Sequence, residues 1–159
     1  DFLENLTHSD DGGIVVDHYL CADENIYAAG DIAQYPYWKT GEPVRTEHWR
    51  TAQQLGICAA QNMLGEAMPF RGVPFFWSSQ LGLHFRYAGH ARTWDDIRVE
   101  GDVPSRDFVA YYVLNGAVVA AAGINRDREI LAAGELLRKG NMPDIQHLED
   151  KSYAILSFL

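Results

Sequence analysis

The stretch DFVAYYVLNGAVVAAAGIN (107–125) carries the strongest local signal in the sequence. Two apolar runs flank Asn115-Gly116, a pair that favours a two-residue type I′ turn because both central residues need positive φ. Two other stretches, LGLHFRYAGH (81–90) and DDIRVEGD (95–102), alternate apolar with polar residues, which is typical of half-buried strands. We therefore predict three or four antiparallel strands in this half of the chain.

A helix is expected directly after this hairpin, over RDREILAAGELLRKG (126–140). We expect Asn125 to cap it and Gly140 to end it. Acidic side chains fall in its first turn and basic ones in its last turn, which suits the helix dipole. The apolar residues that would lie on the sheet are Ile130, Leu131, Leu136 and Leu137. The tail, 141–159, stays open between extended and helical structure.

The N-terminal part reads as shorter elements. Strands are expected over 13–20 and over Ile26–Ala29, followed by a Pro- and Gly-containing loop over 36–48. A helix is expected over 49–64, stopping at Gly65, with Thr46 or a residue beside it as N-cap. Its predicted apolar face consists of Ala52, Leu55, Ala59 and Met63. The segment 66–80 reads as a connection rich in Pro and aromatic residues.

These patterns predict an α+β protein in two pieces, 1–69 and 70–159. The second piece contains the antiparallel sheet and its covering helix. The first piece has only two expected strands and one helix, which give little core, and Ile26–Ala29 is apolar on both sides, as strands of a sheet covered on both faces are. We therefore expect residues 1–69 to be a fragment of a larger α/β domain.

Composition excludes several classes of partner. The 159 residues are 47% hydrophobic and carry a formal charge of -9, which argues against nucleic acid or an anionic membrane surface. No apolar run approaches the roughly 20 residues that span a bilayer, and the start of the chain lacks the pattern of a signal peptide. We expect a soluble cytoplasmic protein.

Cysteine and histidine residues give no sign of a metal site. Cys21 and Cys58 are far apart in sequence and form no Cys-x-x-Cys pair, so both are expected to pack as small hydrophobic residues. A disulfide between them stays open. Since no two His or Cys residues have recognisable ligand spacing, we expect no metal.

The stretch NIYAAGDIAQYP (25–36) presents a choice between two interpretations. Gly30-Asp31 can be an ordinary turn, because Gly accepts unusual dihedral angles and Asp bonds its own backbone. Alternatively, Gly30 lets the backbone approach a ligand, and the Asp31 carboxylate accepts hydrogen bonds from the hydroxyl groups of a polyol.

Three segments carry a resemblance to a known family. GGIVVDHYLCADENIYAAGDIA (12–33) resembles the second flavin-binding signature of the FAD-dependent pyridine nucleotide oxidoreductases, and TEHWRTAQQLGICAAQNMLG (46–65) resembles the helix that follows it. VPFFWSSQLGLHFRYAGHA (73–91) resembles the ferredoxin-reductase-like and apoptosis-inducing-factor-like branch, although Ser79 stands where that branch commonly has Asp. The resemblance runs from Gly12 to Asp144 and implies the reductase C-terminal domain, preceded by part of an FAD-binding domain.

The resemblance implies roles for six residues. In relatives, the counterpart of Asp31 bonds a ribityl or ribose hydroxyl of FAD, after the close backbone approach at Gly30. Glu47, His48 and Trp49 match positions that face the flavin ring and the nicotinamide pocket, and Trp77 matches the dimethylbenzene edge of the flavin. The ordinary alternatives are a plain helix start at 47–49 and packing of Trp77 between the two pieces. Helix and strand periodicity assigns four further residues to the core or an interface, namely Met63, Met68, Tyr111 and Tyr112.

The resemblance implies part of an FAD-dependent NAD(P)H reductase that passes electrons from nicotinamide through flavin to an iron-sulfur protein. No Gly-x-Gly-x-x-Gly occurs in the sequence, so the cradle for the FAD pyrophosphate is missing and the chain alone is not expected to be active. The implied partners are the iron-sulfur acceptor, the FAD-binding domain of the same chain and a possible homodimer copy. The alternative is a non-catalytic dimerisation or partner-interaction module.

Overall fold

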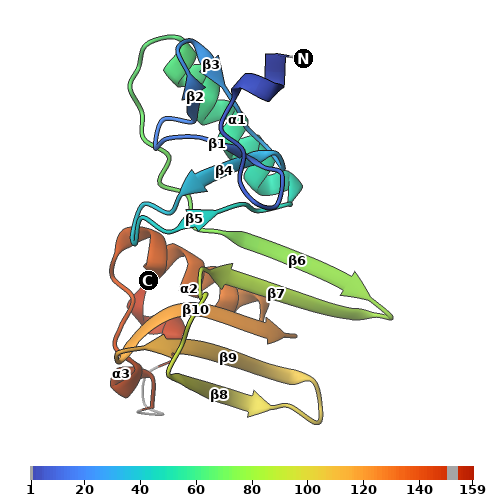
Figure 1. Cartoon of the computed structure of the whole chain (residues 1–159). Coiled ribbons are helices and arrows are strands. Elements are labelled where there is room, and N and C mark those ends of the chain that lie inside the picture. Colours follow the sequence, from blue (N-terminus) through green and yellow to red (C-terminus); the bar gives the residue numbers. More distant parts are fainter. Residues whose placement is uncertain (1, 150–153) are drawn as a thin grey trace. The chain divides into compact units, whose positions relative to one another are not determined.

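The computed structural model describes residues 2–149 and 154–159, and the chain divides into two compact units, Asp1–Gly72 and Val73–Leu159 (Figure 1). The elements of the first unit are η1 (Phe2–Asn5), β1 (Ile14–Val15), β2 (Cys21–Asp23), β3 (Ile26–Tyr27), β4 (Ala33–Pro36), β5 (Pro43–Val44) and α1 (Trp49–Met63). Those of the second are β6 (Phe75–Gln80), β7 (Leu83–Gly89), β8 (Asp96–Asp102), β9 (Asp107–Leu114), β10 (Ala117–Ile124), α2 (Asp127–Lys139), α3 (Ile145–Glu149) and η2 (Ile155–Phe158).

The second unit is built on a five-stranded sheet with the order β6-β7-β10-β9-β8, and all its neighbouring strands are antiparallel. The predicted α+β class is confirmed. The expectation that 66–80 is only a connection is wrong for its last part, because Phe75–Gln80 forms the edge strand β6. Leu81 and Gly82, with φ of 51° and 76°, turn the chain tightly enough for β6 to pair with β7.

The predicted turn at Asn115-Gly116 is confirmed. Both residues have positive φ, 53° and 81°, and they join β9 to β10. The register of this pair shifts between Val118 and Ala120, which is a bulge opposite the end of β9.

Helix α2 follows the sheet as predicted and ends at Gly140, whose φ of 75° is the left-handed cap expected of glycine. The predicted cap at Asn125 is wrong, because Arg126 occupies the N-cap position. Asn125 itself has φ of 56°, and its Nδ2 donates instead to the Arg106 carbonyl at 3.0 Å. Leu131, expected on the sheet, is 48% exposed.

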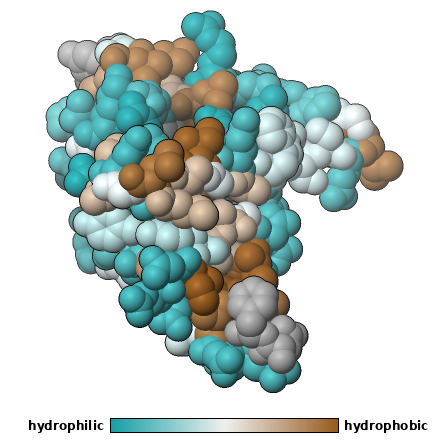
Figure 2. Space-filling view, turned by 90° about the horizontal axis from the view of Figure 1, so that it is seen from above, coloured by the Kyte–Doolittle hydropathy of each residue, from teal (hydrophilic) through white to brown (hydrophobic). Residues whose placement is uncertain are grey.

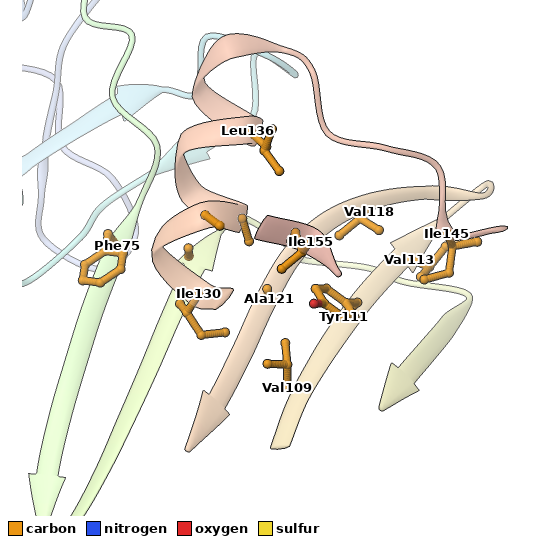
Figure 3. Packing of buried hydrophobic residues seen from close by; sticks show 13 residues of the cluster. Phe75, Val109, Tyr111, Val113, Val118, Ala121, Ile130, Leu136, Ile145 and Ile155 are labelled. Atoms are coloured by element: carbon orange, nitrogen blue, oxygen red, sulfur yellow. The ribbon is translucent and has the colours of Figure 1, made fainter. Parts of the chain in front are cut away.

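The core of the second unit lies between α2 and the sheet, with side chains from η2 and α3 completing it (Figure 3). Small residues let the helix come close to the strands, since Ala132 and Ala133 of α2 and Ala88 and Ala121 of the sheet are all buried. A Cβ added at Gly134 would already touch the Cβ of Ala88 at 3.4 Å. Tyr111 is the largest side chain of this core and is 2% exposed, so its predicted burial is confirmed.

The first unit has a three-stranded sheet with the order β1-β4-β5, beside the β2-β3 hairpin. The expected strand over Ile26–Ala29 is wrong in extent, because β3 ends at Tyr27 and Ala28 and Ala29 are irregular and half-buried. The expected strand over 13–20 shrinks to β1. The strand that pairs parallel with β1 is β4, which follows the Gly30-Asp31 turn and ends at Pro36, a residue that we read as loop.

Helix α1 packs on the core of the first unit through Leu55 and Ala59, as predicted, but Thr51 and Asn62 are buried in place of Ala52 and Met63. Its buried residues are Thr51, Leu55, Cys58, Ala59 and Asn62. Met63 is 67% exposed and Met68 47% exposed, so neither is a core residue. Leu64 caps the helix just before Gly65, whose φ is 86°. Both cysteines are free thiols, Cys58 buried and Cys21 half-buried.

Surface features follow from the composition. Figure 2 shows hydrophobic patches separated by hydrophilic residues on the face that it draws. Within 2–149 and 154–159, no helix is long and apolar enough to cross a membrane. The same ranges contain no group of three or more His, Cys, Asp or Glu residues that could hold a metal ion.

Candidate functional site

The Gly30-Asp31 segment forms a closed turn in the first unit. The Ala33 amide donates to the Gly30 carbonyl at 3.0 Å, which places Asp31 at the first corner of the turn. Gly30 has φ of +85°, a backbone conformation that residues other than glycine rarely adopt. A Cβ added there would lie 3.7 Å from the Cβ of Ala52, so the turn lies against the first turn of α1.

The Asp31 carboxylate is exposed, and it makes no hydrogen bond with any group among residues 2–149 and 154–159. Its backbone carbonyl is occupied, because Arg45 Nη1 donates to it at 2.9 Å. Asp31 is therefore fixed through its main chain while its side-chain oxygens remain available to accept hydrogen bonds from a ligand.

The start of α1 is capped by a histidine. His48 has extended backbone dihedrals, φ −154° and ψ 132°, and its Nδ1 accepts from the Arg50 amide at 3.3 Å. A ring nitrogen that accepts from an N–H carries no proton, so the neutral ring holds its proton on Nε2. Burial lowers the pKa of His48, Arg50 lowers it further, and the nearby Asp31 carboxylate partly opposes both. The predicted cap at Thr46 is wrong; its hydroxyl lies 3.3 Å from that of Tyr35.

Glu47 and Trp49 flank this capping histidine, and both are exposed. The Trp49 side chain is 63% exposed, and its ring stacks on His48 with 5.9 Å between centroids and an interplanar angle of 28°. Glu47 Oε1 pairs with Arg45 Nη2 at 2.9 Å, which leaves the carboxylate partly neutralised. Five of the six predicted residues thus belong to the turn or to the start of α1.

Trp77, the sixth, belongs to β6 in the second unit. Its side chain is partly buried against the core of that unit and meets Phe75 edge-on, with 5.9 Å between ring centroids. Ser79, on the same face of β6, lies 2.8 Å from His84 Nδ1 through its hydroxyl. These contacts account for Trp77 as a packing residue within its own unit, and the role implied for it at the flavin stays a prediction.

Sequence reasoning missed Arg45, although it contacts two of the segments singled out. Its third partner is Asp11, whose Oδ2 accepts from Arg45 Nε at 2.9 Å. Hydrogen bonds from the Ser9 hydroxyl and from Arg45 lower the pKa of Asp11 to about 2. The signal that could have revealed this cluster is Asp11 directly before Gly12-Gly13, in a loop where an acidic side chain can bond neighbouring amides.

A comparison with protein families shows to which family the chain belongs. Residues 75–159, which include the whole five-stranded sheet and α2, match the family described as "Reductase C-terminal". The chain belongs to this reductase family. The resemblance seen in the sequence, to the ferredoxin-reductase-like and apoptosis-inducing-factor-like branch of the FAD-dependent oxidoreductases, is thereby confirmed.

Two curated relatives show how far the similarity extends. The chain is 36% identical over 121 residues to apoptosis-inducing factor 3 of Mus musculus, a match that covers 72% of this chain and 20% of that protein. It is 35% identical over 152 residues to the ferredoxin--NAD(+) reductase component of the anthranilate 1,2-dioxygenase system of Burkholderia cepacia, covering 94% of this chain and 37% of that protein. The chain thus spans well under half the length of these relatives.

Solved structures share the fold across both units. The ferredoxin reductase for the CYP199A2 system of Rhodopseudomonas palustris superimposes with a TM-score of 0.84 at 26% identity, covering 96% of this chain and 37% of that one. The putidaredoxin reductase in a covalent complex with putidaredoxin gives a TM-score of 0.85 at 24% identity, covering 97% and 37%. At that identity the second match shows the fold alone.

Proposed function

We propose that the chain is part of an FAD-dependent NAD(P)H reductase that passes electrons from the nicotinamide through the flavin to an iron-sulfur protein. Residues 1–69 would belong to the FAD-binding domain and 70–159 to the reductase C-terminal domain. Support comes from the family match at 75–159 and from relatives named as ferredoxin--NAD(+) reductase components.

The observation that carries the proposal is the Asp31 carboxylate, exposed on a turn closed by a main-chain hydrogen bond and without a hydrogen-bonding partner among the described residues. A carboxylate in that state can accept hydrogen bonds from two hydroxyl groups, as a ribityl or ribose moiety would supply. The glycine before it, at φ +85°, brings main chain rather than side chain next to that position. These features fit the polyol part of FAD.

The residues at the start of α1 fit the ring system. Bound FAD would supply the redox chemistry, accepting a hydride and releasing single electrons. The Trp49 ring, 63% exposed, offers area for stacking and for excluding water. Glu47, 61% exposed at its side chain, keeps acceptor capacity for the carboxamide of a nicotinamide beyond its pair with Arg45. Burial and the nearby Arg50 lower the pKa of His48, which favours a neutral ring beside Trp49.

The fit is incomplete at the pyrophosphate. The sequence contains no Gly-x-Gly-x-x-Gly turn, so nothing in it supplies the nest of backbone amides that holds a dinucleotide. The 159-residue chain mixed with FAD should therefore keep no flavin through gel filtration. A yellow preparation with one FAD per chain would contradict this expectation and would show that the chain holds FAD without such a turn.

The direct test replaces Asp31 in a complete reductase that carries this chain. Asp31→Ala should weaken FAD binding by about 1–3 kcal/mol, the cost of losing hydrogen bonds to a charged acceptor. Asp10→Ala is the matched control, since Asp10 is also an exposed acidic residue of the first unit. FAD affinity is measured by flavin fluorescence. Equal affinity in both variants and the wild type would favour the interpretation of Gly30-Asp31 as an ordinary turn without a role in FAD binding.

A second candidate function is homodimerisation through the second unit. The face of the sheet opposite α2 carries a chain of aromatic contacts, Phe76 to Tyr87 at 5.1 Å, Tyr87 to Tyr112 at 6.1 Å and Tyr112 to Trp94 at 5.2 Å. Trp94 is 47% exposed on this face. Sedimentation velocity across a concentration series should reveal a dimer that Trp94→Ser weakens; a monomer at every concentration would exclude this candidate.

A further inference from the structure

Arg45 binds three separate segments of the first unit with one guanidinium group. Nε donates to Asp11 Oδ2, Nη1 donates to the Asp31 carbonyl, and Nη2 pairs with Glu47 Oε1, each at 2.9 Å. The loop before β1, the turn before β4 and the residues before α1 are thus joined at a single side chain. Two of these segments contain the residues proposed to contact FAD.

The loop before β1 is shaped to accept this side chain. A Cβ at Gly13 would lie 2.7 Å from Arg45 Cδ, so the arginine stem crosses the main chain where glycine leaves room for it. Asp11 is itself held in place, because the Ser9 hydroxyl donates to its Oδ1 at 2.5 Å. The anchor that receives Arg45 is therefore already ordered by its own loop.

Charge and geometry favour arginine over lysine at this position. The fork of the guanidinium presents donors in fixed directions within one plane, whereas an ammonium is a compact point charge. A lysine at position 45 could pair with one of the two carboxylates but could not also hold the Asp31 carbonyl in the same arrangement. The side chain is 22% exposed, so these contacts are partly shielded from water.

We propose that Arg45 is a positioning residue for cofactor binding: it fixes the Gly30-Asp31 turn relative to Glu47 and the start of α1. Arg45 acts through the main chain of Asp31 and the carboxylate of Glu47 and does not itself contact the cofactor. The pair with Arg45 also partly neutralises Glu47, which leaves Asp31 as the unpaired carboxylate of the cluster. This inference rests on the proposed function of the Asp31 turn.

The first arm of the test needs no cofactor. In the 159-residue chain, the Ala33 amide closes the turn by donating to the Gly30 carbonyl, so its hydrogen exchange reports on the turn. Arg45→Lys should speed this exchange about tenfold, because a local opening is made easier, while amides in the middle of α1 stay unchanged. Arg71→Lys is the matched control, an exposed arginine of the same unit. Unchanged exchange at Ala33 in Arg45→Lys would overturn the proposal.

The second arm uses a complete reductase that carries the chain. Arg45→Lys should raise the Kd for FAD about tenfold, as loss of a supporting contact does for ligands held by other residues. The unfolding temperature of the flavin-free protein is measured beside it. A contact that only stabilises the fold would lower that temperature and leave the Kd at its wild-type value, and this result would also overturn the proposal.

The two arms separate this inference from the function on which it rests. If the wild-type reductase binds no FAD, the proposed function fails and Arg45 has no cofactor to position, whatever the exchange data show. If the wild type binds FAD and Asp31→Ala weakens it, but Arg45→Lys binds as tightly as the wild type, the proposed function stands and the role given to Arg45 is wrong. Faster exchange together with a raised Kd supports it.

Discussion

Asn62 and Met68 form a closed pair of hydrogen bonds: the Met68 amide donates to Asn62 Oδ1 at 2.6 Å, and Asn62 Nδ2 donates to the Met68 carbonyl at 2.9 Å. The same Nδ2 donates to the Tyr19 carbonyl at 2.7 Å. A single buried amide on α1 therefore ties the helix to two loops of the first unit, and its polar atoms are satisfied although it is only 6% exposed.

Replacing this amide should destabilise the first unit strongly. Asn62→Ala removes the side-chain partner of the Met68 amide and of the Tyr19 carbonyl and leaves the Met68 carbonyl with only the Cys58 thiol, so we expect a loss of about 2–4 kcal/mol in the free energy of unfolding. Gln53→Ala, at an exposed position of the same helix, should change it by less than about 0.5 kcal/mol. Urea unfolding measures both, and similar values for the two variants would show that Asn62 has no special structural role.

Removing the buried hydroxyl of Tyr111 in the second unit should, in contrast, not destabilise the protein. Tyr111 is buried, and its hydroxyl forms no hydrogen bond within the part of the chain that the structure describes. Burial raises the pKa of Tyr111 and Glu100 raises it further, so the group is neutral at any ordinary pH. Tyr111→Phe should therefore leave stability unchanged or raise it by up to about 1 kcal/mol.

The matched control for Tyr111 is Tyr35, a buried tyrosine of the first unit whose hydroxyl lies 3.3 Å from that of Thr46. Tyr35→Phe should cost about 0.5–1.5 kcal/mol, the net value of a hydrogen bond. A clear loss of stability in Tyr111→Phe would indicate that Glu100 accepts a hydrogen bond from Tyr111 in solution.

Two glycines of the second unit, Gly89 at the end of β7 and Gly116 in the turn between β9 and β10, should respond differently to alanine. A Cβ at Gly89 would lie 2.4 Å from the Val119 carbonyl oxygen and 2.6 Å from Ala120 Cα, and neither backbone atom can move away cheaply. Gly89→Ala should therefore cost about 2–5 kcal/mol through overpacking and strain. Gly116→Ala meets no atom within 4 Å, so only its φ of +81° opposes the change, and a cost of about 1–2 kcal/mol is expected. Hydrogen exchange of the β10 amides compares the two; equal effects would be inconsistent with this packing.

Acid should weaken the Arg45 cluster over a defined range of pH. Hydrogen bonds from Ser9 and Arg45 lower the pKa of Asp11 from 3.8 to about 2 in the folded chain. A carboxyl group with a lowered pKa stabilises the fold above its unfolded value, and this contribution disappears as pH falls from about 4 to 2. The stability difference between wild type and Asp11→Asn should shrink over that range, as followed by urea unfolding at each pH. A difference that does not vary with pH would contradict the assignment.

The sequence predicts the second unit better than the first. Its elements carry strong local patterns: the Asn115-Gly116 turn, the alternation in 81–90 and the dipole-matched ends of α2 all appear in the structure. The strand β6 escaped prediction because prolines just before it suggested a loop. In the first unit, β1 and β4 are two and four residues long and gain stability from pairing in parallel with residues distant in sequence. Such pairing leaves little trace in a local pattern.

The candidate site likewise contains features that local sequence patterns predict and others that they do not. The left-handed glycine before Asp31 and the helix start at Trp49 could be located from sequence, because each follows a local rule. The cap by His48 could not, since Ser, Thr, Asp and Asn are the usual capping residues. The three contacts of Arg45 join residues 11, 31 and 47, and no pattern of spacing links such positions before the fold is known.

The small residues packed between α2 and the sheet, Gly134 and Ala88 among them, limit which substitutions this protein can accept during evolution. A methyl group added at Gly134 would just reach contact with the Ala88 Cβ, at 3.4 Å, and Ala88 has only one methyl group to lose. A lineage that gained a side chain larger than alanine at position 134 would have to shift the helix outward or replace the alanine on β7 with glycine. Substitutions by larger residues at these two positions should therefore arise together, and an alignment of relatives would show positions 88 and 134 as a correlated pair.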